Sequence, residues 1–315
     1  MAMAVALSER GRARSAPNPN VGCVLVKEGR VVGRGWTQPG GRPHAEAMAL
    51  AQAGEQAKGA TAFVTLEPCA HESGRGPACA DLLVQSGVST VVGALEDPDP
   101  RTAGRGYARL VEAGVAVLVG PGADAARRAM AGWLMRQREG RPFVTLKLAT
   151  SLDGCIALAS GESRWITGPE ARAHGHLERA RANLIVVGRG TYEADAPRLD
   201  VRLAGLEDRA PRRAILSRTI PPAKWEGLTT PADIARLTAV DWVLVEGGAE
   251  TASAFLRDGL VDRLLLYRAP ILLGGGKACL SDMGLAKLDH AHGQWALEDR
   301  RTLGADTLDV YLRAS

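Results

Sequence analysis

The side chains best suited to chemistry lie in the first third of the chain. His44 is followed two positions later by Glu46, and Cys69 and Cys79 come further along. One imidazole and two thiolates bind zinc well, and three protein ligands leave a fourth position for water. Zinc lowers the pKa of such a water toward about 7 and so yields a zinc-bound hydroxide at neutral pH. With Glu46 as proton shuttle, the pattern predicts hydrolytic deamination.

A closed structural zinc site is the alternative interpretation of the same residues. It needs a fourth protein ligand, and His71, two positions after Cys69, is the candidate. That interpretation leaves Glu46 without a role. The remaining cysteines are expected to be small core residues: Cys23, Cys155 and Cys279.

Length and composition limit the class of protein. A chain of 315 residues predicts two domains, and 46% hydrophobic with 23% charged residues is ordinary for a globular protein. A net charge of +4 and 4% aromatic residues argue against nucleic-acid binding. Five sparse cysteines suit a reducing compartment. The first residues form neither a signal peptide nor a membrane span, so we expect a cytoplasmic protein that does not bind membranes.

Strands and helices are expected to alternate in both halves of the chain, which indicates two α/β domains. Residues 21–26 and 31–36 predict a hairpin, and 45–53 a helix. Gly120-Pro121-Gly122 is a break, and a connecting helix over 123–138 is expected to end near Gly140. We therefore place the domains at residues 1–140 and 141–315.

The motifs resemble those of a known family, the bifunctional riboflavin-biosynthesis deaminase–reductases, over nearly the whole chain. The deaminase part of the resemblance is carried by Asn18-Pro19-Asn20-Val21-Gly22, Pro43-His44-Ala45-Glu46 and Thr65-Leu66-Glu67-Pro68-Cys69. The reductase part is carried by Leu146-Lys147-Leu148, Ser151-Leu152-Asp153-Gly154, Ala159-Ser160-Gly161-Glu162-Ser163, Trp165-Ile166-Thr167, Asp195 with Pro197, and Val245-Glu246-Gly247-Gly248. Both sets in this order are more specific than either alone.

The resemblance implies a cytidine-deaminase-like three-layer αβα domain followed by a dihydrofolate-reductase-like α/β domain. It implies zinc on His44, Cys69 and Cys79, with Glu46 as the catalytic residue. It also implies substrate contacts from Asn20 and Arg75. An amide can read a pyrimidine edge and a guanidinium can bind a phosphate, although a turn residue and a solvated loop charge are the ordinary interpretations.

For the second domain, the resemblance implies NADPH-dependent reduction of a ribosyl chain to a ribityl chain. The substrate of the whole enzyme would be the small phosphorylated pyrimidine 2,5-diamino-6-(5-phosphoribosylamino)pyrimidin-4(3H)-one, and the enzyme is expected to be a homo-oligomer. The implied cofactor contacts are Ala149, Trp165, Thr191, Asp195, Ser217 and Gly248. The implied substrate contacts are Ser163, Arg179, Leu199, Arg202 and Glu246.

Physical arguments support part of this assignment. Gly247-Gly248 ends a strand and opens a helix, so backbone amides there can approach a pyrophosphate closely. No Gly-x-Gly-x-x-Gly follows a first strand, so a Rossmann-type fold is not expected. Asp195 and Glu246 are expected on the same side of one cleft. Either carboxyl group, or water, could supply the proton that reduction of an imine requires.

The sequence also departs from the family pattern. Nine residues separate Cys69 and Cys79, one more than is usual, which puts the role of Arg75 in question. Asp99 and Cys155 stand where Asn and a basic residue are common, and the stretch 220–241 is short. Two rival functions are a nucleic-acid deaminase with a regulatory domain and a zinc-stabilised nucleotide-sensing protein. The low aromatic content disfavours the first, and Glu46 beside an open metal site disfavours the second.

Overall fold

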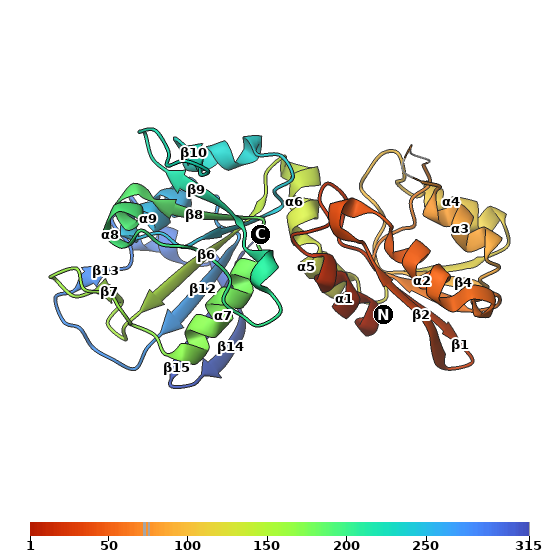
Figure 1. Ribbon diagram of the computed structural model, residues 1–315, viewed down its shortest axis with the longest axis horizontal. Coiled ribbons are helices and arrows are strands. Elements are labelled where there is room, and N and C mark those ends of the chain that lie inside the picture. Colours follow the sequence, from red (N-terminus) through yellow and green to blue (C-terminus); the bar gives the residue numbers. More distant parts are fainter. Residues whose placement is uncertain (72–73, 75, 315) are drawn as a thin grey trace. The chain divides into compact units, whose positions relative to one another are not determined.

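The computed structural model describes residues 1–71, 74 and 76–314. The chain divides into two compact units, Met1–Gly140 and Arg141–Ser315 (Figure 1). Each unit has its own sheet and its own buried core. Among the described residues, none of the helices is both long and apolar enough to cross a membrane.

The first unit is built on a five-stranded sheet of order β2-β1-β3-β4-β5. The β1–β2 hairpin turns at Glu28 and Gly29, which have φ of 50° and 73°, as the sequence predicted for this segment. β3, β4 and β5 are parallel to one another. The strands are β1 (Gly22–Lys27), β2 (Arg30–Trp36), β3 (Thr61–Val64), β4 (Thr90–Gly93) and β5 (Ala116–Val119).

Helices cover both faces of this sheet. Because side chains alternate along a strand, Cys23 and Leu25 of β1 face one helical layer, and Val24 faces the other. The first layer holds α2 (Ala45–Ala53), α3 (Cys79–Gln85) and α4 (Arg105–Glu112), and α1 (Ala2–Ser8) packs on the opposite face. The expected connecting helix is two helices, α5 (Ala123–Ala129) and α6 (Ala131–Glu139), because the fully buried Met130 leaves the helical conformation between them.

Two glycines let α2 lie close against β2. A Cβ atom on Gly35 would be 2.1 Å from the backbone oxygen of Ala45, and one on Gly33 would be 2.2 Å from that of Ala49. Any larger residue would push the helix away from the strand. This approach fixes the N-terminal turn of α2, which carries Glu46.

The second unit has an eight-stranded sheet of order β10-β9-β8-β11-β6-β12-β15-β14. The strands from β10 to β12 are parallel, and β15 and β14 are added antiparallel. The bounds are β6 (Phe143–Thr150), β8 (Leu184–Gly188), β9 (Arg212–Leu216), β10 (Glu226–Leu228), β11 (Trp242–Val245), β12 (Arg263–Arg268), β14 (Trp295–Leu303) and β15 (Asp306–Arg313). A separate two-stranded ribbon pairs β7 (Cys155–Ala157) with β13 (Lys277–Ala278).

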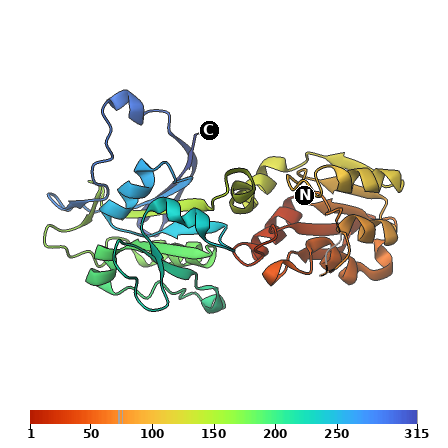
Figure 2. The ribbon, with the colours of Figure 1, turned by 90° about the horizontal axis from the view of Figure 1, so that it is seen from above.

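Helices also cover both faces of this second sheet (Figure 2). α9 (Ala249–Arg257) buries Ala252 and Phe255 against one face, and α7 (Pro169–Ala180) buries Ala171 against the other. α8 (Arg189–Asp195) follows β8 directly. Short 3-10 helices complete the chain at Glu9–Gly11, Pro39–Gly41, Gly54–Ala57, Glu207–Arg209, Pro231–Arg236 and Leu288–Ala291.

A buried carboxylate organises the loop that leads from β4 to α4. Glu67 accepts backbone hydrogen bonds from Asp97 (3.1 Å), Gly104 (3.0 Å), Gly106 (2.8 Å) and Tyr107 (3.2 Å). Only 3% of Glu67 is exposed to solvent, so water competes little for its carboxylate oxygens. The carboxylate therefore holds together a loop that has no regular structure of its own.

We predict that Glu67→Gln lowers the free energy of unfolding of the first unit by about 1.5–3 kcal/mol, because hydrogen bonds to a charged acceptor are lost and an amide donor faces N–H groups. Urea unfolding measures the loss, and hydrogen exchange should quicken at Gly104 and Gly106. Asp81→Asn, which removes the half-exposed ion pair with Arg109, is the control and should cost less than about 1 kcal/mol. Equal effects of the two variants would contradict the prediction.

Candidate functional site

Three metal-ligating side chains converge in the first unit. His44 precedes α2, Cys69 lies in the loop after β3, and Cys79 is the first residue of α3. The Nδ1 atom of His44 is 3.3 Å from the Sγ of Cys79 and 3.6 Å from the Sγ of Cys69. The ligand atoms all lie within 4.8 Å of one another, and this donor set fits a zinc ion.

The two thiols of this cluster are not equivalent. The backbone N–H and the thiol of Cys79 both face the Cys69 sulfur, the former at 3.3 Å. Hydrogen bonding from Cys79 lowers the pKa of Cys69 to about 4, and the same sharing raises the pKa of Cys79. Cys69 is therefore ready to act as a thiolate ligand, and metal binding must displace the proton of Cys79.

Glu46 lies in the first turn of α2, beside the cluster. Its side chain is buried, and burial raises the pKa of its carboxyl group to about 7. A carboxyl group with that pKa can both accept and release a proton near neutral pH. Glu46 and His44 line a cavity of about 220 Å³, which we call the cluster cavity.

The closed-site alternative is not supported by the position of His71. Its Nδ1 is 3.3 Å from the hydroxyl oxygen of Thr102, and His71 lines the cluster cavity without joining the ligand group. The ligand group found among the described residues contains His44, Cys69 and Cys79 only. A fourth coordination position can therefore face the cavity.

The two asparagines of the first motif lie in different surroundings. Asn20 is 2% exposed and does not line the cluster cavity, because its amide donates to the backbone oxygens of Ser8 (3.2 Å) and Ala129 (3.0 Å). The expected substrate contact of Asn20 thus lacks a geometric basis. Asn18 lines the cavity instead and lies 2.8 Å from Nε2 of His44, where it can fix the orientation of the imidazole.

The charges around the cluster cavity are partly neutralised. Arg101 is paired with Asp99, whose pKa this hydrogen bond lowers. Burial raises the pKa of Asp97 to about 6. Arg42 also lines the cavity, and its buried Nε has no hydrogen-bond partner among the described residues. Arg75, which the sequence suggested as a phosphate contact, lies outside the described residues.

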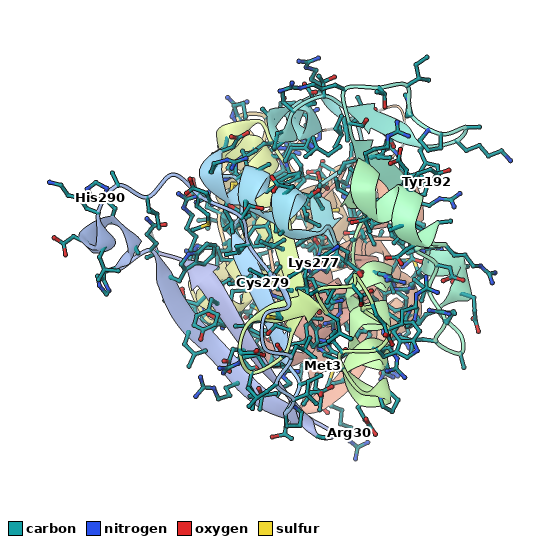
Figure 3. The ribbon with its side chains drawn as sticks, turned by 90° about the vertical axis from the view of Figure 1, so that its left-hand side faces the viewer. Met3, Arg30, Tyr192, Lys277, Cys279 and His290 are labelled. Carbon is teal, nitrogen blue, oxygen red and sulfur yellow. The ribbon has the colours of Figure 1, made fainter. Side chains whose placement is uncertain are left out.

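Two adjoining cavities occupy the second unit at the carboxyl ends of its parallel strands. The first, of about 880 Å³, is lined by Gly247 and Gly248, and we call it the glycine cavity. Lys277 of β13, labelled in Figure 3, also lines it. The second, of about 510 Å³, is lined by Arg172, Arg179 and Arg202, and we call it the arginine cavity. The side chains common to both are Lys147, Ala149, Ile156, Ser163, Thr191, Asp195 and Glu246.

Most of the expected cofactor contacts surround the glycine cavity. Ala149, Thr191, Asp195 and Gly248 line it, and the N–H of Gly248 donates to the hydroxyl oxygen of Thr191 at 3.2 Å. Ser217 does not line the glycine cavity itself. It accepts a hydrogen bond from Nε of Arg189, which does line the cavity.

Trp165, the remaining expected cofactor contact, lies at the adjoining cavity. It is exposed and lines the arginine cavity, where the guanidinium of Arg172 stacks 4.8 Å from its ring. The expected substrate contacts all line this arginine cavity: Ser163, Arg179, Leu199, Arg202 and Glu246.

Glu246 is a buried, ion-paired carboxylate. Arg179 donates to both of its oxygens, at 2.7 and 2.9 Å, and Nζ of Lys147 is 3.8 Å away. Burial alone would raise its pKa, but the charges of Lys147 and Arg179 outweigh burial and lower the pKa to about 2. Glu246 is therefore ionised at neutral pH and has no proton to give. Asp195 lines the same two cavities and forms a half-exposed pair with Arg164.

Several residues at these cavities were not identified from the sequence. Lys147 could have been found, because it is the only charged side chain in the apolar strand β6. Arg42, Arg189 and His176 gave no comparable signal, since isolated charged residues in loops and helices are usually solvated.

Family models match both parts of the chain. Residues 1–95 match the cytidine and deoxycytidylate deaminase zinc-binding region, and residues 142–230 and 232–308 match the RibD C-terminal domain. The mixed α/β fold predicted from the sequence is thereby confirmed, with a cytidine-deaminase-like first domain and a reductase-like second domain.

Relatives match along almost their whole length. The riboflavin biosynthesis protein RibD of Escherichia coli is 40% identical, over 97% of this chain and 96% of the relative. RibD of Mycobacterium tuberculosis is 41% identical, over 98% and 95%.

Solved structures agree with the sequence matches. Acinetobacter baumannii RibD superposes with a TM-score of 0.89 at 37% identity, covering 100% of this chain and 98% of the other. A Thermotoga maritima diaminohydroxyphosphoribosylaminopyrimidine deaminase/5-amino-6-(5-phosphoribosylamino)uracil reductase gives 0.87 at 30% identity, covering 100% and 97%. The chain therefore belongs to the RibD family of bifunctional enzymes, which carry out a deamination and a reduction in riboflavin biosynthesis.

Proposed function

We propose that the domain of residues 1–140 deaminates 2,5-diamino-6-(5-phosphoribosylamino)pyrimidin-4(3H)-one, and that the domain of residues 141–315 reduces the ribosyl chain of the product with NADPH. The observation that carries the proposal is the pairing of two different sites in one chain. A His44–Cys69–Cys79 cluster stands beside a buried carboxyl group in one unit, and a glycine cavity adjoins an arginine cavity in the other.

In the first domain, His44, Cys69 and Cys79 would hold zinc, which when bound supplies a Lewis acid that activates water. Glu46 accepts the proton of that water and returns it to the ring and to the departing ammonia. Its raised pKa suits both halves of this task. Asn18 and Arg42, which line the same cavity, are placed to contact the base and its anionic substituent.

In the second domain, the nicotinamide cofactor would lie in the glycine cavity and supply the hydride when bound. The Gly247–Gly248 turn has no side chains that would keep a pyrophosphate from the backbone N–H groups of α9. Thr191 accepts the N–H of Gly248 and so supports the turn. We propose that the reductase domain uses NADPH in preference to NADH.

We assign the supply of the proton in the reduction to Lys147. Glu246 is ionised, and Lys147 is the cationic side chain that lines both cavities in the described part of the chain. An ammonium group there can protonate the nitrogen of an imine while Glu246 accepts hydrogen bonds from the hydroxyls of the sugar chain. Arg179 and Arg202 bring positive charge to the arginine cavity, where the phosphate would be bound.

Replacing Glu46 by Gln is expected to lower deamination by about 10²–10⁴-fold, because the amide keeps the shape but cannot carry the proton. Ammonia release measures the loss. Metal analysis should still find one zinc per chain, and oxidation of NADPH with the deaminated substrate should be unchanged. Glu55→Gln, at an exposed position after α2, is the matched control. Near wild-type ammonia release by Glu46→Gln would refute the role of Glu46.

The two carboxylates of the second domain are expected to differ in importance. Glu246→Gln should strongly decrease the reductase activity and lower the melting temperature, because it leaves Arg179 and Lys147 without their buried anion. Asp195→Asn should have a smaller effect, since its partner Arg164 is exposed. Both variants should release ammonia at the normal rate. A Glu246→Gln enzyme with normal NADPH oxidation would remove Glu246 from the site.

The reductase should work without the deaminase. A fragment of residues 141–315 is expected to oxidise NADPH with the deaminated substrate. It retains Arg141, which donates to both oxygens of Asp262 at 2.8 Å. A fragment of residues 143–315 lacks this pair and should melt at a lower temperature with the same KM. A folded but inactive 141–315 fragment would show that the second unit depends on the first or is not a reductase.

A further inference from the structure

One face of α7 is directed into the arginine cavity. Arg172, His176 and Arg179 are spaced by four and three residues, so they lie on the same side of the helix, and all three line the cavity. The two arginines fit a site for an anion. A histidine between two cations is the feature that this description leaves unexplained.

The contacts of His176 determine where its single proton lies. Nδ1 is 3.1 Å from the backbone oxygen of Asp200, and Nε2 is 3.3 Å from Nε of Arg202. A carbonyl oxygen can only accept and a guanidinium nitrogen can only donate. The backbone N–H of Arg202 also lies 3.4 Å from Nδ1. A hydrogen on Nδ1 satisfies the two shorter contacts, whereas a hydrogen on Nε2 would satisfy only this longer one and would face Nε–H of Arg202. The contacts therefore favour a neutral imidazole with the hydrogen on Nδ1 and the lone pair on Nε2.

The surroundings of His176 favour this neutral form. Burial and the charges of Arg179 and Arg202 lower its pKa, against weaker opposing effects of the Asp200 backbone oxygen and Glu246. Arg172 faces the same cavity from the preceding turn of α7. A protonated ring would lose its acceptor for Arg202 and would add a cation to a group of cations.

His176 acts on a side chain that would otherwise be poorly held. The side chain of Arg202 is 59% exposed, and its ion pair with Asp200 is long, at 3.5 Å. The imidazole accepts a hydrogen bond from Nε of Arg202, so the two terminal nitrogens of the guanidinium can bind a ligand. Arg179 also donates to the backbone oxygen of Asp200, at 3.1 Å, so α7 holds this loop at two points.

We propose that His176 is a positioning residue, which as a neutral imidazole protonated on Nδ1 directs the guanidinium of Arg202 toward the phosphate of the reductase substrate. The inference rests on the proposed function, which places a phosphorylated sugar chain in the arginine cavity. Two parallel N–H groups match two oxygens of a phosphomonoester, and this fit depends on the angle at which the guanidinium is presented.

The test compares His176→Leu with His176→Gln in the full-length enzyme. Leucine removes both hydrogen bonds, whereas the glutamine amide can donate to Asp200 and accept from Arg202. KM for the phosphorylated substrate should rise about fivefold to tenfold in His176→Leu with kcat nearly unchanged, and should stay close to the wild-type value in His176→Gln. His174→Leu removes another imidazole of α7, which hydrogen-bonds the hydroxyl group of Tyr267 on β12, and should leave KM unchanged.

Further measurements separate failure of this inference from failure of the proposed function. With the dephosphorylated substrate, wild type and His176→Leu should have equal KM values. If Arg202→Ala leaves KM unchanged, the proposed phosphate site is wrong. If Arg202→Ala raises KM but His176→Leu does not, or if His176→Gln behaves like His176→Leu, the positioning role is overturned. Nitrogen NMR of the wild-type protein checks the tautomer without any variant, and a hydrogen on Nε2 would overturn it as well.

Discussion

Parallel strand pairing is the constraint on which both sites depend. Neighbouring parallel strands end at the same edge of a sheet, so the segments that follow them meet there. In the first domain, the loops after β3 and β4 bring Cys69 and Asp99 to one cavity. In the second, the ends of β6, β8 and β11 bring Lys147, Thr191 and Glu246 together. Residues far apart in the sequence thereby become neighbours without any long loop.

Compensation of buried charge is the second requirement, and the two domains meet it differently. Glu67 accepts hydrogen bonds from four backbone N–H groups and so holds a loop in shape. Glu246 is neutralised by Arg179 and Lys147 and so remains a carboxylate inside a ligand cavity. For Glu46, burial outweighs the opposing effects of His44 and Cys79, and the raised pKa leaves it able to hold a proton. In the proposed function, the same residue type thus serves support, recognition and proton transfer according to its surroundings.

The sequence was informative where chemistry is encoded in short spacings. The His44–Glu46 pair and the two cysteines predicted a metal cluster, because few residue types bind zinc. It could not distinguish Asn18 from Asn20, since the direction of a side chain in an irregular segment depends on tertiary packing. The break at Met130, which has φ of −106° and ψ of 14°, was missed because methionine is not a helix-breaking residue. Positions of strands and helices were easier, because the alternation of apolar residues reports them directly.

Because the glycine and arginine cavities share side chains, the free energy of binding in one cavity is expected to depend on whether the other is occupied. A molecule bound in one cavity would contact Lys147, Asp195 and Glu246, and would thereby affect side chains that also line the other cavity. Linkage requires that such an influence be mutual: whatever the first occupant does to the affinity for the second, the second does equally to the affinity for the first. If the cavities hold the hydride donor and acceptor as proposed, the shared side chains would therefore make the binding of the two cooperative without any conformational change.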